Sequence, residues 1–176
     1  FQLKNHLLNL KKNRIPQIIR KEETELHDFQ PAFSTGNRTR SFLKIQDGCN
    51  YKCSFCTIPL ARGKSRSDKV LNIIDKIKNL KKEGIKEIVL TGVNIGDFHS
   101  KAGEKLIDLL KVIDKIQDIR VRISSIEPNL ITDEIIELIS QSNTFAPHFH
   151  IPLQSGSDYI LKKMKRRYLT KYYKKI

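Results

Sequence analysis

The chain has 176 residues, of which 39% are hydrophobic and 30% are charged, so it can form one domain around a core and does not have the composition of a disordered chain. No run approaches the roughly 18 apolar residues of a membrane-spanning helix, and no basic-then-apolar leader opens the chain, which argues against a membrane or secreted protein. The formal net charge of +14, from 33 Lys and Arg against 19 Asp and Glu, fits either a polyanionic partner such as a nucleic acid or lysines that are solvated on helix faces.

Residues 1–36 differ in pattern from the rest of the chain. Leucines at positions 3, 7, 8 and 10 have helical spacing, and two prolines interrupt the mixed-charge segment that follows. We expect a terminal helix and a linker over 1–36, followed by a separate domain over 37–176. Because the chain begins with Phe1 and ends without a closing element, we also expect it to be a piece of a longer protein.

From Ser41 onward, short apolar or alternating runs that fit strands are interleaved with amphipathic runs that fit helices. The predicted strands cover 41–46, 87–92, 119–125 and 148–153, and the predicted helices cover 70–82, 106–116, 131–140 and 155–164. Gly84 is a stop signal after the first helix, and Thr132 fits the N-cap of the third. This order predicts an α/β fold with a parallel sheet, either open and doubly wound or an incomplete barrel, that binds ligands at the carboxyl ends of its strands.

All three cysteines lie in one loop after the first predicted strand, with the spacing Cys49-x3-Cys53-x2-Cys56. An odd, clustered set fits a reducing compartment, and we expect a cytoplasmic protein. A structural zinc site would need a fourth ligand, which only a distant histidine could supply. The second interpretation, three unliganded cysteines packed in the core, does not fit a loop that contains Gly, Asn and Lys. The third interpretation is an iron–sulfur cluster of four irons, in which three thiolates leave one iron open.

The cysteine spacing, its place after the first strand of a β/α domain, and the aromatic Phe55 just before Cys56 resemble the radical S-adenosylmethionine (SAM) superfamily. The resemblance implies a partial (βα)6 barrel of the TIM-like kind, with about four of its β/α units in this chain. It also implies that Cys49, Cys53 and Cys56 hold one [4Fe-4S] cluster whose open iron binds SAM. In that superfamily the reduced cluster cleaves SAM to methionine and a 5'-deoxyadenosyl radical, which abstracts a hydrogen atom from the substrate.

Two longer segments resemble the methylthiotransferase branch of this superfamily: "GNRTRSFLKIQDGCNYKCSFCTIPLARGKSRS" (36–67) and "HFHIPLQSGSDYILKKMKRRY" (148–168). Residues 38–50 and 90–98 are most similar to the members that act on threonylcarbamoyladenosine beside the anticodon of tRNA. The implied reaction replaces the hydrogen on carbon 2 of the adenine with a methylthio group. The alternatives within the branch are isopentenyladenosine in tRNA and an aspartate of a ribosomal protein. A zinc-stabilised RNA-binding module without catalysis and a radical enzyme with a small-molecule substrate are alternatives of other classes.

The resemblance also implies partners and cofactors beyond this chain. A tRNA anticodon stem-loop would be the substrate, and an electron donor such as flavodoxin or ferredoxin would reduce the cluster. A second SAM would supply the methyl group, and a second cluster would be held by the N-terminal domain, of which residues 1–36 resemble the end. We expect a monomer without a membrane partner, and we expect this chain alone to bind one cluster and SAM without full turnover.

Seven residues near the cysteine loop or after the strands are the predicted SAM contacts: Phe55, Arg62, Thr91, Gly92, Glu127, Gln154 and Ser155. No catalytic side chain is predicted beyond the cluster ligands. Many superfamily members carry Gly-Glu after the second strand, where this chain has Gly92 and Val93, so the backbone at Thr91 and Gly92 would replace the missing carboxylate. The plainer alternatives are an ordinary turn at Gly92, a linker carboxylate at Glu127 and a solvated or phosphate-binding arginine at Arg62.

Overall fold

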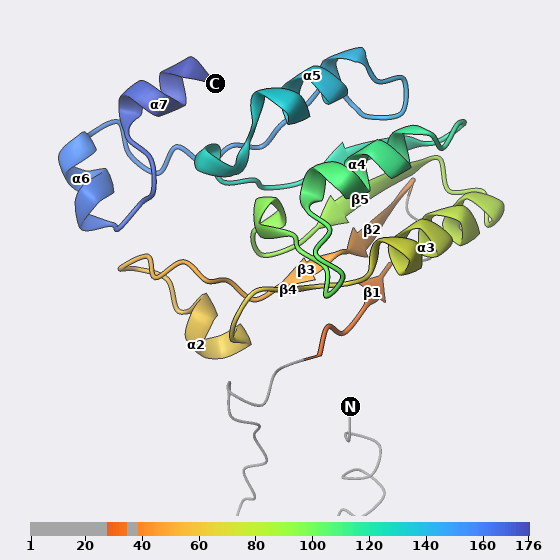
Figure 1. Ribbon diagram of the computed structural model, residues 1–176, viewed down its shortest axis with the longest axis horizontal. Coiled ribbons are helices and arrows are strands. Elements are labelled where there is room, and N and C mark those ends of the chain that lie inside the picture. The colour runs from red at the N-terminus through yellow and green to blue at the C-terminus, as the bar shows by residue number, and fades with distance from the viewer. Residues whose placement is uncertain (1–27, 35–38) are drawn as a thin grey trace, which may run out of the picture.

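The computed structural model describes residues 28–34 and 39–176, and Figure 1 shows how its helices and strands are arranged. The helix expected within residues 1–36 lies outside the described residues. In chain order the elements are β1 (Ala32–Phe33), β2 (Arg40–Lys44), β3 (Gln46–Asp47), α2 (Ile58–Arg62), β4 (Arg66–Ser67), α3 (Val70–Lys82), β5 (Glu87–Thr91), η2 (Ile95–Asp97), α4 (Leu106–Asp114), β6 (Arg120–Ile123), η3 (Pro128–Leu130), α5 (Asp133–Gln141), α6 (Asp158–Lys163) and α7 (Thr170–Lys175).

A four-stranded sheet in the order β1-β2-β5-β6 forms the centre of the fold. Strands β2, β5 and β6 run parallel, whereas β1, which belongs to the segment predicted as a linker, pairs antiparallel with β2. Helices α3 and α4 connect consecutive parallel strands, as the interleaved strand and helix patterns predict. A separate ribbon pairs β3 with β4, and residues 48–65 form the loop between these two short strands.

One face of the sheet is buried beneath helices. Leu43, Leu90 and Ile123 are neighbours in register across β2, β5 and β6, and each is at most 2% exposed. The buried stripe of α3 consists of Val70, Ile73, Ile74, Ile77 and Leu80. Burying one such side chain contributes roughly 1.5–3 kcal/mol. This packing stabilises α3, since a helix of its length is marginal in isolation.

The opposite face of the sheet is partly exposed and charged. Phe42 is 37% exposed there, and its neighbours in register are Val89 and Arg122. Arg122 donates from Nε to Oε1 of Glu87 at 3.3 Å. A parallel sheet is normally covered on both faces, so this open face fits a barrel of which the chain supplies a part.

The predicted fourth strand is wrong. Residues 148–153 form a single isolated bridge, between His150 and Ser125. Pro147 and Pro152 lie at either end of this segment, and a proline has no N–H to donate to a ladder. The segment therefore follows β6 as an extended chain without becoming a full strand.

The four predicted helices are confirmed with small shifts at their ends. Helix α3 covers the predicted residues, and α4 ends at Asp114, two residues before the predicted end. Helix α5 begins after Thr132, whose Oγ1 accepts the N–H of Ile135 at 3.3 Å as an N-cap does. Among the described residues, no helix is both long and apolar enough to cross a lipid bilayer.

Candidate functional site

The cysteine loop, residues 48–65, is narrow at its base. Gly48 has φ +70°, and a Cβ at this position would lie 2.1 Å from the carbonyl oxygen of Lys64. The N–H of Cys49 donates to the carbonyl of Gly63 at 3.1 Å, which closes the two arms of the loop against each other. Only glycine fits here, because it adopts a positive φ without strain and has no Cβ to collide with the opposite arm.

A fully buried glutamine joins this base to the segment that follows β5. Gln46 donates from Nε2 to the carbonyl of Gly48 at 2.8 Å and to Oγ of Ser65 at 3.0 Å. Its Oε1 accepts the N–H of Asn94 at 2.9 Å. A Cβ at Gly92 would lie 2.8 Å from that same Oε1, so the packing of Gln46 by itself favours glycine at this position. The predicted role of Gly92 toward SAM stays a prediction.

The carboxylate of Asp47 gathers three cations beside the loop. Lys44, Arg62 and Arg66 lie 3.2, 3.3 and 3.2 Å from its oxygens, and the N–H of Gly48 donates to Oδ1 at 2.8 Å. Burial works to raise the pKa of Asp47, but the Gly48 N–H and the cations outweigh it and hold the pKa below its usual value. The Arg62 side chain remains 52% exposed, so its predicted contact with SAM stays a prediction.

The three cysteines lie at different depths. Cys53 is buried, while Cys49 and Cys56 are half-buried. Sγ of Cys49 accepts the N–H of Tyr51 at 3.4 Å, and the N–H of Cys56 donates to the carbonyl of Cys53 at 3.1 Å. Burial raises the pKa of the Cys49 thiol, and the negative charges of Asp97 and of the thiolates of Cys53 and Cys56 act in the same direction. A bound cation would reverse this effect, because it stabilises the thiolates.

The segment after α6 packs against the cysteine loop. The N–H of Ser54 donates to the carbonyl of Met164 at 3.2 Å, and Nη1 of Arg166 donates to Sγ of Cys53 at 3.1 Å. The guanidinium of Arg167 lies 3.8 Å from the ring centroid of Tyr51, close enough for a cation–π interaction. Figure 1 shows α6 on the same side of the molecule as this loop. The two segments are therefore joined although more than a hundred residues separate them.

The carboxyl ends of β5 and β6 also face the loop. Nδ2 of Asn129, after β6, donates to the hydroxyl of Tyr51 at 2.8 Å. Oγ of Ser65 donates to the carbonyl of Asp97, after β5, at 3.4 Å. The loop thus lies at the edge of the sheet where parallel α/β folds bind their ligands, as the sequence predicts.

Several buried polar atoms at this edge have no hydrogen-bond partner among the described residues. They are both amide atoms of Asn94, Oδ2 of Asp97, Oδ1 of Asn129 and Nε of Arg166. Leaving such an atom buried and unpaired costs roughly 1–3 kcal/mol. Polar atoms of this kind fit a polar ligand that binds at this edge of the sheet.

The remaining predicted SAM contacts have distinct positions. Phe55 is 54% exposed on the cysteine loop. Thr91 ends β5, and its carbonyl accepts the N–H of Ile45 at 2.9 Å. Gln154 is exposed with φ +64°, and Oγ of Ser155 accepts the N–H of Ser157 at 3.1 Å. Their predicted roles toward SAM stay predictions.

Glu127 is already engaged in a buried ion pair. One of its oxygens accepts a hydrogen bond from Nη2 of Arg166, and the side chains of Glu127 and Arg166 are 15% and 4% exposed. Burial works against the charged guanidinium, but the hydrogen bond and the charge of Glu127 outweigh it, so the pKa of Arg166 is raised. Glu127 therefore reaches any ligand as part of a pair, which the sequence did not reveal.

Sequence reasoning missed the residues that support the loop, namely Gln46, Asp47, Tyr51, Asn129 and Arg166. Tyr51 lies inside the cysteine motif, so its position was a usable signal. The sequence contains no such signal for Arg166, because "KKMKRRY" has the pattern of a solvated basic helix end.

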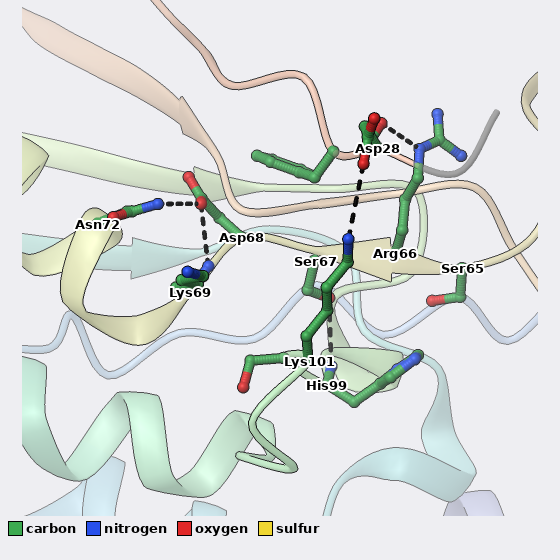
Figure 2. A pocket seen from close by; sticks show the side chains of 11 residues that line it. Asp28, Ser65, Arg66, Ser67, Asp68, Lys69, Asn72, His99 and Lys101 are labelled. Atoms are coloured by element: carbon green, nitrogen blue, oxygen red, sulfur yellow. Dashed lines mark hydrogen bonds and ion pairs between the residues drawn. The ribbon is translucent and has the colours of Figure 1, made fainter.

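A cavity of about 450 Å³ lies beside β4 and the start of α3. Figure 2 shows that several of its polar side chains already have partners, with Lys101 pointing at Asp28 and Asn72 donating to Asp68. Arg66, which also lines it, is directed to Asp47 and to the carbonyl of Asp28. The cysteines are not among its lining residues, so this cavity is separate from the cysteine site.

The sequence model of the radical SAM superfamily matches residues 43–176. The chain belongs to the radical SAM superfamily. In sequence it is similar to threonylcarbamoyladenosine tRNA methylthiotransferase MtaB of Thermotoga maritima, with 45% identity over 134 residues that cover 75% of this chain and 31% of that protein. It is also similar to MtaB of Bacillus subtilis, with 45% identity over 150 residues that cover 81% of this chain and 32% of that protein. It is also similar to tRNA-2-methylthio-N(6)-dimethylallyladenosine synthase of Staphylococcus aureus (35% over 167 residues, 93% and 32%). The chain spans about a third of the length of these relatives.

Solved structures support the fold. The radical S-adenosylmethionine methyltransferase TsrM of Kitasatospora setae, solved with cobalamin and a [4Fe-4S] cluster, matches with a TM-score of 0.62 at 17% identity, over 75% of this chain and 25% of that one. A second structure of TsrM, with tryptophan and a SAM analogue, matches with a TM-score of 0.63 over 76% and 26%. The predicted family and the predicted partial radical SAM fold are both confirmed.

Proposed function

We propose that this chain is part of the radical SAM core of a tRNA methylthiotransferase that modifies carbon 2 of threonylcarbamoyladenosine. The observation that carries the proposal is the cysteine loop itself, which presents three thiols beside unpaired buried polar atoms at the ligand-binding edge of a radical SAM fold. The two relatives that are 45% identical to this chain over 134 and 150 aligned residues bear the threonylcarbamoyladenosine name.

Cys49, Cys53 and Cys56 would hold a [4Fe-4S] cluster, each thiolate binding one iron. A cluster with SAM at its open iron supplies one-electron chemistry that can break an unactivated C–H bond. The protein's part is to hold the thiolates at the end of the sheet and to exclude water from the buried Cys53. The second SAM, the second cluster and the electron donor of the flavodoxin or ferredoxin class belong to the complete enzyme.

The seven predicted SAM contacts remain part of the proposal, and the positions of three of them indicate how they would contact SAM. Thr91 and Gly92 lie at the carboxyl end of β5, beside Gln46 and the unpaired amide of Asn94. The carbonyl of Thr91 already accepts one hydrogen bond, and a carbonyl oxygen can accept a second from the amino group of a ligand. Glu127 would act together with Arg166.

The zinc-stabilised RNA-binding module has less support. A single zinc ion needs its ligands around one point, at roughly 2.0–2.3 Å from the metal. Within residues 28–34 and 39–176, no three His, Cys, Asp or Glu side chains are placed to hold one ion. A cluster makes no such demand, because its irons are separate and each cysteine binds a different one.

The proposed substrate is an anticodon stem-loop of tRNA, and the net charge of +14 suits its phosphates. We propose that the enzyme acts in the cytoplasm as a monomer. Isopentenyladenosine is the second candidate, because the Staphylococcus aureus relative is named for dimethylallyladenosine at 35% identity.

The test uses the full-length enzyme with reductant and SAM on two tRNA substrates, one carrying threonylcarbamoyladenosine and the other isopentenyladenosine. Nucleosides released by digestion are measured by mass spectrometry. We expect the methylthio product from the first tRNA only. Product from the second tRNA alone would reassign the substrate, and product from neither would contradict the proposed activity.

A further inference from the structure

Arg166 reaches the cysteine loop from a sharp turn. Helix α6 ends at Lys163, and Lys165 adopts φ +56° in the turn that follows. Lys165 is exposed, whereas the side chain of Arg166 is only 4% exposed. A non-glycine residue with positive φ is uncommon and is held by its surroundings. The turn directs one cation of a lysine-rich segment inward while its neighbours stay in solvent.

The buried guanidinium joins three segments of the fold. Nη1 donates to Sγ of Cys53 at 3.1 Å, and Nη2 donates to the carboxylate of Glu127, which precedes η3 after β6. The ring of Tyr168 lies 5.3 Å from the Arg166 guanidinium carbon and covers it. A buried arginine is costly unless it is paired, and here its pairs are one carboxylate and one cysteine sulfur.

The neighbouring arginine has a different environment. Arg167 is exposed and stacks on the ring of Tyr51, and its guanidinium makes no hydrogen bond to a cysteine sulfur among the described residues. The two adjacent arginines thus carry the same charge, but only Arg166 contacts a sulfur. This difference argues for a specific role for Arg166 that general electrostatic attraction does not explain.

We propose that Arg166 is a positioning residue that donates a hydrogen bond to the Cys53 sulfur and raises the reduction potential of the cluster. The proposal rests on the proposed function, since it requires the cluster. Reduction adds one negative charge to the cluster, and a buried guanidinium beside a ligand sulfur stabilises the more negative state. Hydrogen bonds to cluster sulfurs and local charge are among the features that set such potentials.

The charge of Glu127 should affect the reduction potential of the cluster in the direction opposite to that of Arg166. Its carboxylate partly neutralises Arg166, so removing its charge leaves the cation more effective toward the cluster. Loss of Arg166 should therefore lower the potential, and Glu127→Gln should raise it. A merely structural contribution would give a different pattern, because loosening the loop admits water, and water also stabilises the more charged reduced cluster and raises the potential.

The experiment reconstitutes this chain anaerobically with iron and sulfide and titrates the cluster with a graded series of reductant potentials, followed by electron paramagnetic resonance (EPR). We expect Arg166→Met to shift the equilibrium toward the oxidised cluster about tenfold, which is about 59 mV for one electron. Arg167→Met is the matched control and should shift it less than half as far, and Glu127→Gln should shift it the opposite way. Iron and sulfide content and circular dichroism confirm that each variant is folded and loaded.

The outcomes separate the inference from the proposed function. A wild-type chain that takes up no cluster would contradict the proposed function. The inference alone would be overturned if the wild type takes up a cluster but the reduction potential of Arg166→Met is unchanged, raised or equal to that of Arg167→Met. If Arg166→Met does not retain a cluster, Arg166→Lys decides: it keeps the charge without the planar fork, so we expect a smaller lowering, and an unchanged or raised potential would overturn the inference.

Discussion

Replacing Gly48 with alanine should disrupt the base of the cysteine loop. An alanine at φ +70° costs roughly 1–2 kcal/mol in backbone conformation alone. Its methyl would also lie 2.1 Å from the carbonyl oxygen of Lys64, so the two arms of the loop must move apart. That movement breaks the hydrogen bonds from Cys49 to Gly63 and from Gln46 to Gly48, each worth roughly 0.5–1.5 kcal/mol. We expect Gly48→Ala to lower the free energy of unfolding by about 3–4 kcal/mol.

Gly84→Ala provides the control. Gly84 has φ +87°, so the conformational cost is similar, but a Cβ there would meet no atom within 4 Å. We expect a loss of only about 1–2 kcal/mol, as for any residue forced into the left-handed region. Urea unfolding followed by circular dichroism measures both variants, and iron content after reconstitution should fall for Gly48→Ala alone. Equal losses of stability in the two variants would refute the steric reasoning.

Three further predictions concern stability, each measured by urea unfolding. Burial works to raise the pKa of Asp68, but hydrogen bonds from Lys76, Asn72 and a backbone N–H outweigh it and lower the pKa. The contribution of Asp68 to stability is therefore present above the ordinary carboxyl pKa of roughly 4 and is lost as the pH falls through the lowered value. Asp68→Asn should be destabilising at pH 7 and nearly neutral in strong acid, and an equal effect at both pH values would contradict this. Ile77→Ala should cost about 2–5 kcal/mol because Ile77 is fully buried, whereas Leu71→Ala, at a side chain 75% exposed, should cost under about 0.5 kcal/mol. Thr132→Ala should cost about 1 kcal/mol through loss of the α5 cap, and Thr132→Ser, which keeps the hydroxyl, should recover most of it.

The elements with a local signal were predictable from sequence. Helix α3 has a complete apolar stripe, and Gly84 marks its end, so its bounds follow from periodicity and one stop signal. The cysteine spacing after a strand placed the candidate site at the correct edge of the sheet. The fourth strand failed because its apolar pattern is that of a strand, while Pro147 and Pro152 remove the donors that a ladder needs.

The supporting contacts of the site were not predictable from pattern. Arg166 and Cys53 are 113 residues apart, and nothing in the local sequence distinguishes Arg166 from the exposed basic residues around it. Likewise, Gln46 ends the predicted strand and Asp47 begins the loop after it, and only the ribbon of β3 and β4 shows that they hold the base of the loop. Long-range pairing of polar side chains depends on the fold, so sequence periodicity cannot reveal it.

The cluster with an open iron is tested most directly by anaerobic reconstitution of this chain with iron and sulfide. Visible spectra are recorded first, and EPR spectra are then recorded with and without SAM after reduction of the cluster by one electron with dithionite. We expect a brown protein with a [4Fe-4S] signal that shifts when SAM is added, and loss of that signal in Cys53→Ala. A colourless chain that instead binds one zinc ion tightly would contradict the radical SAM function and support a structural metal site.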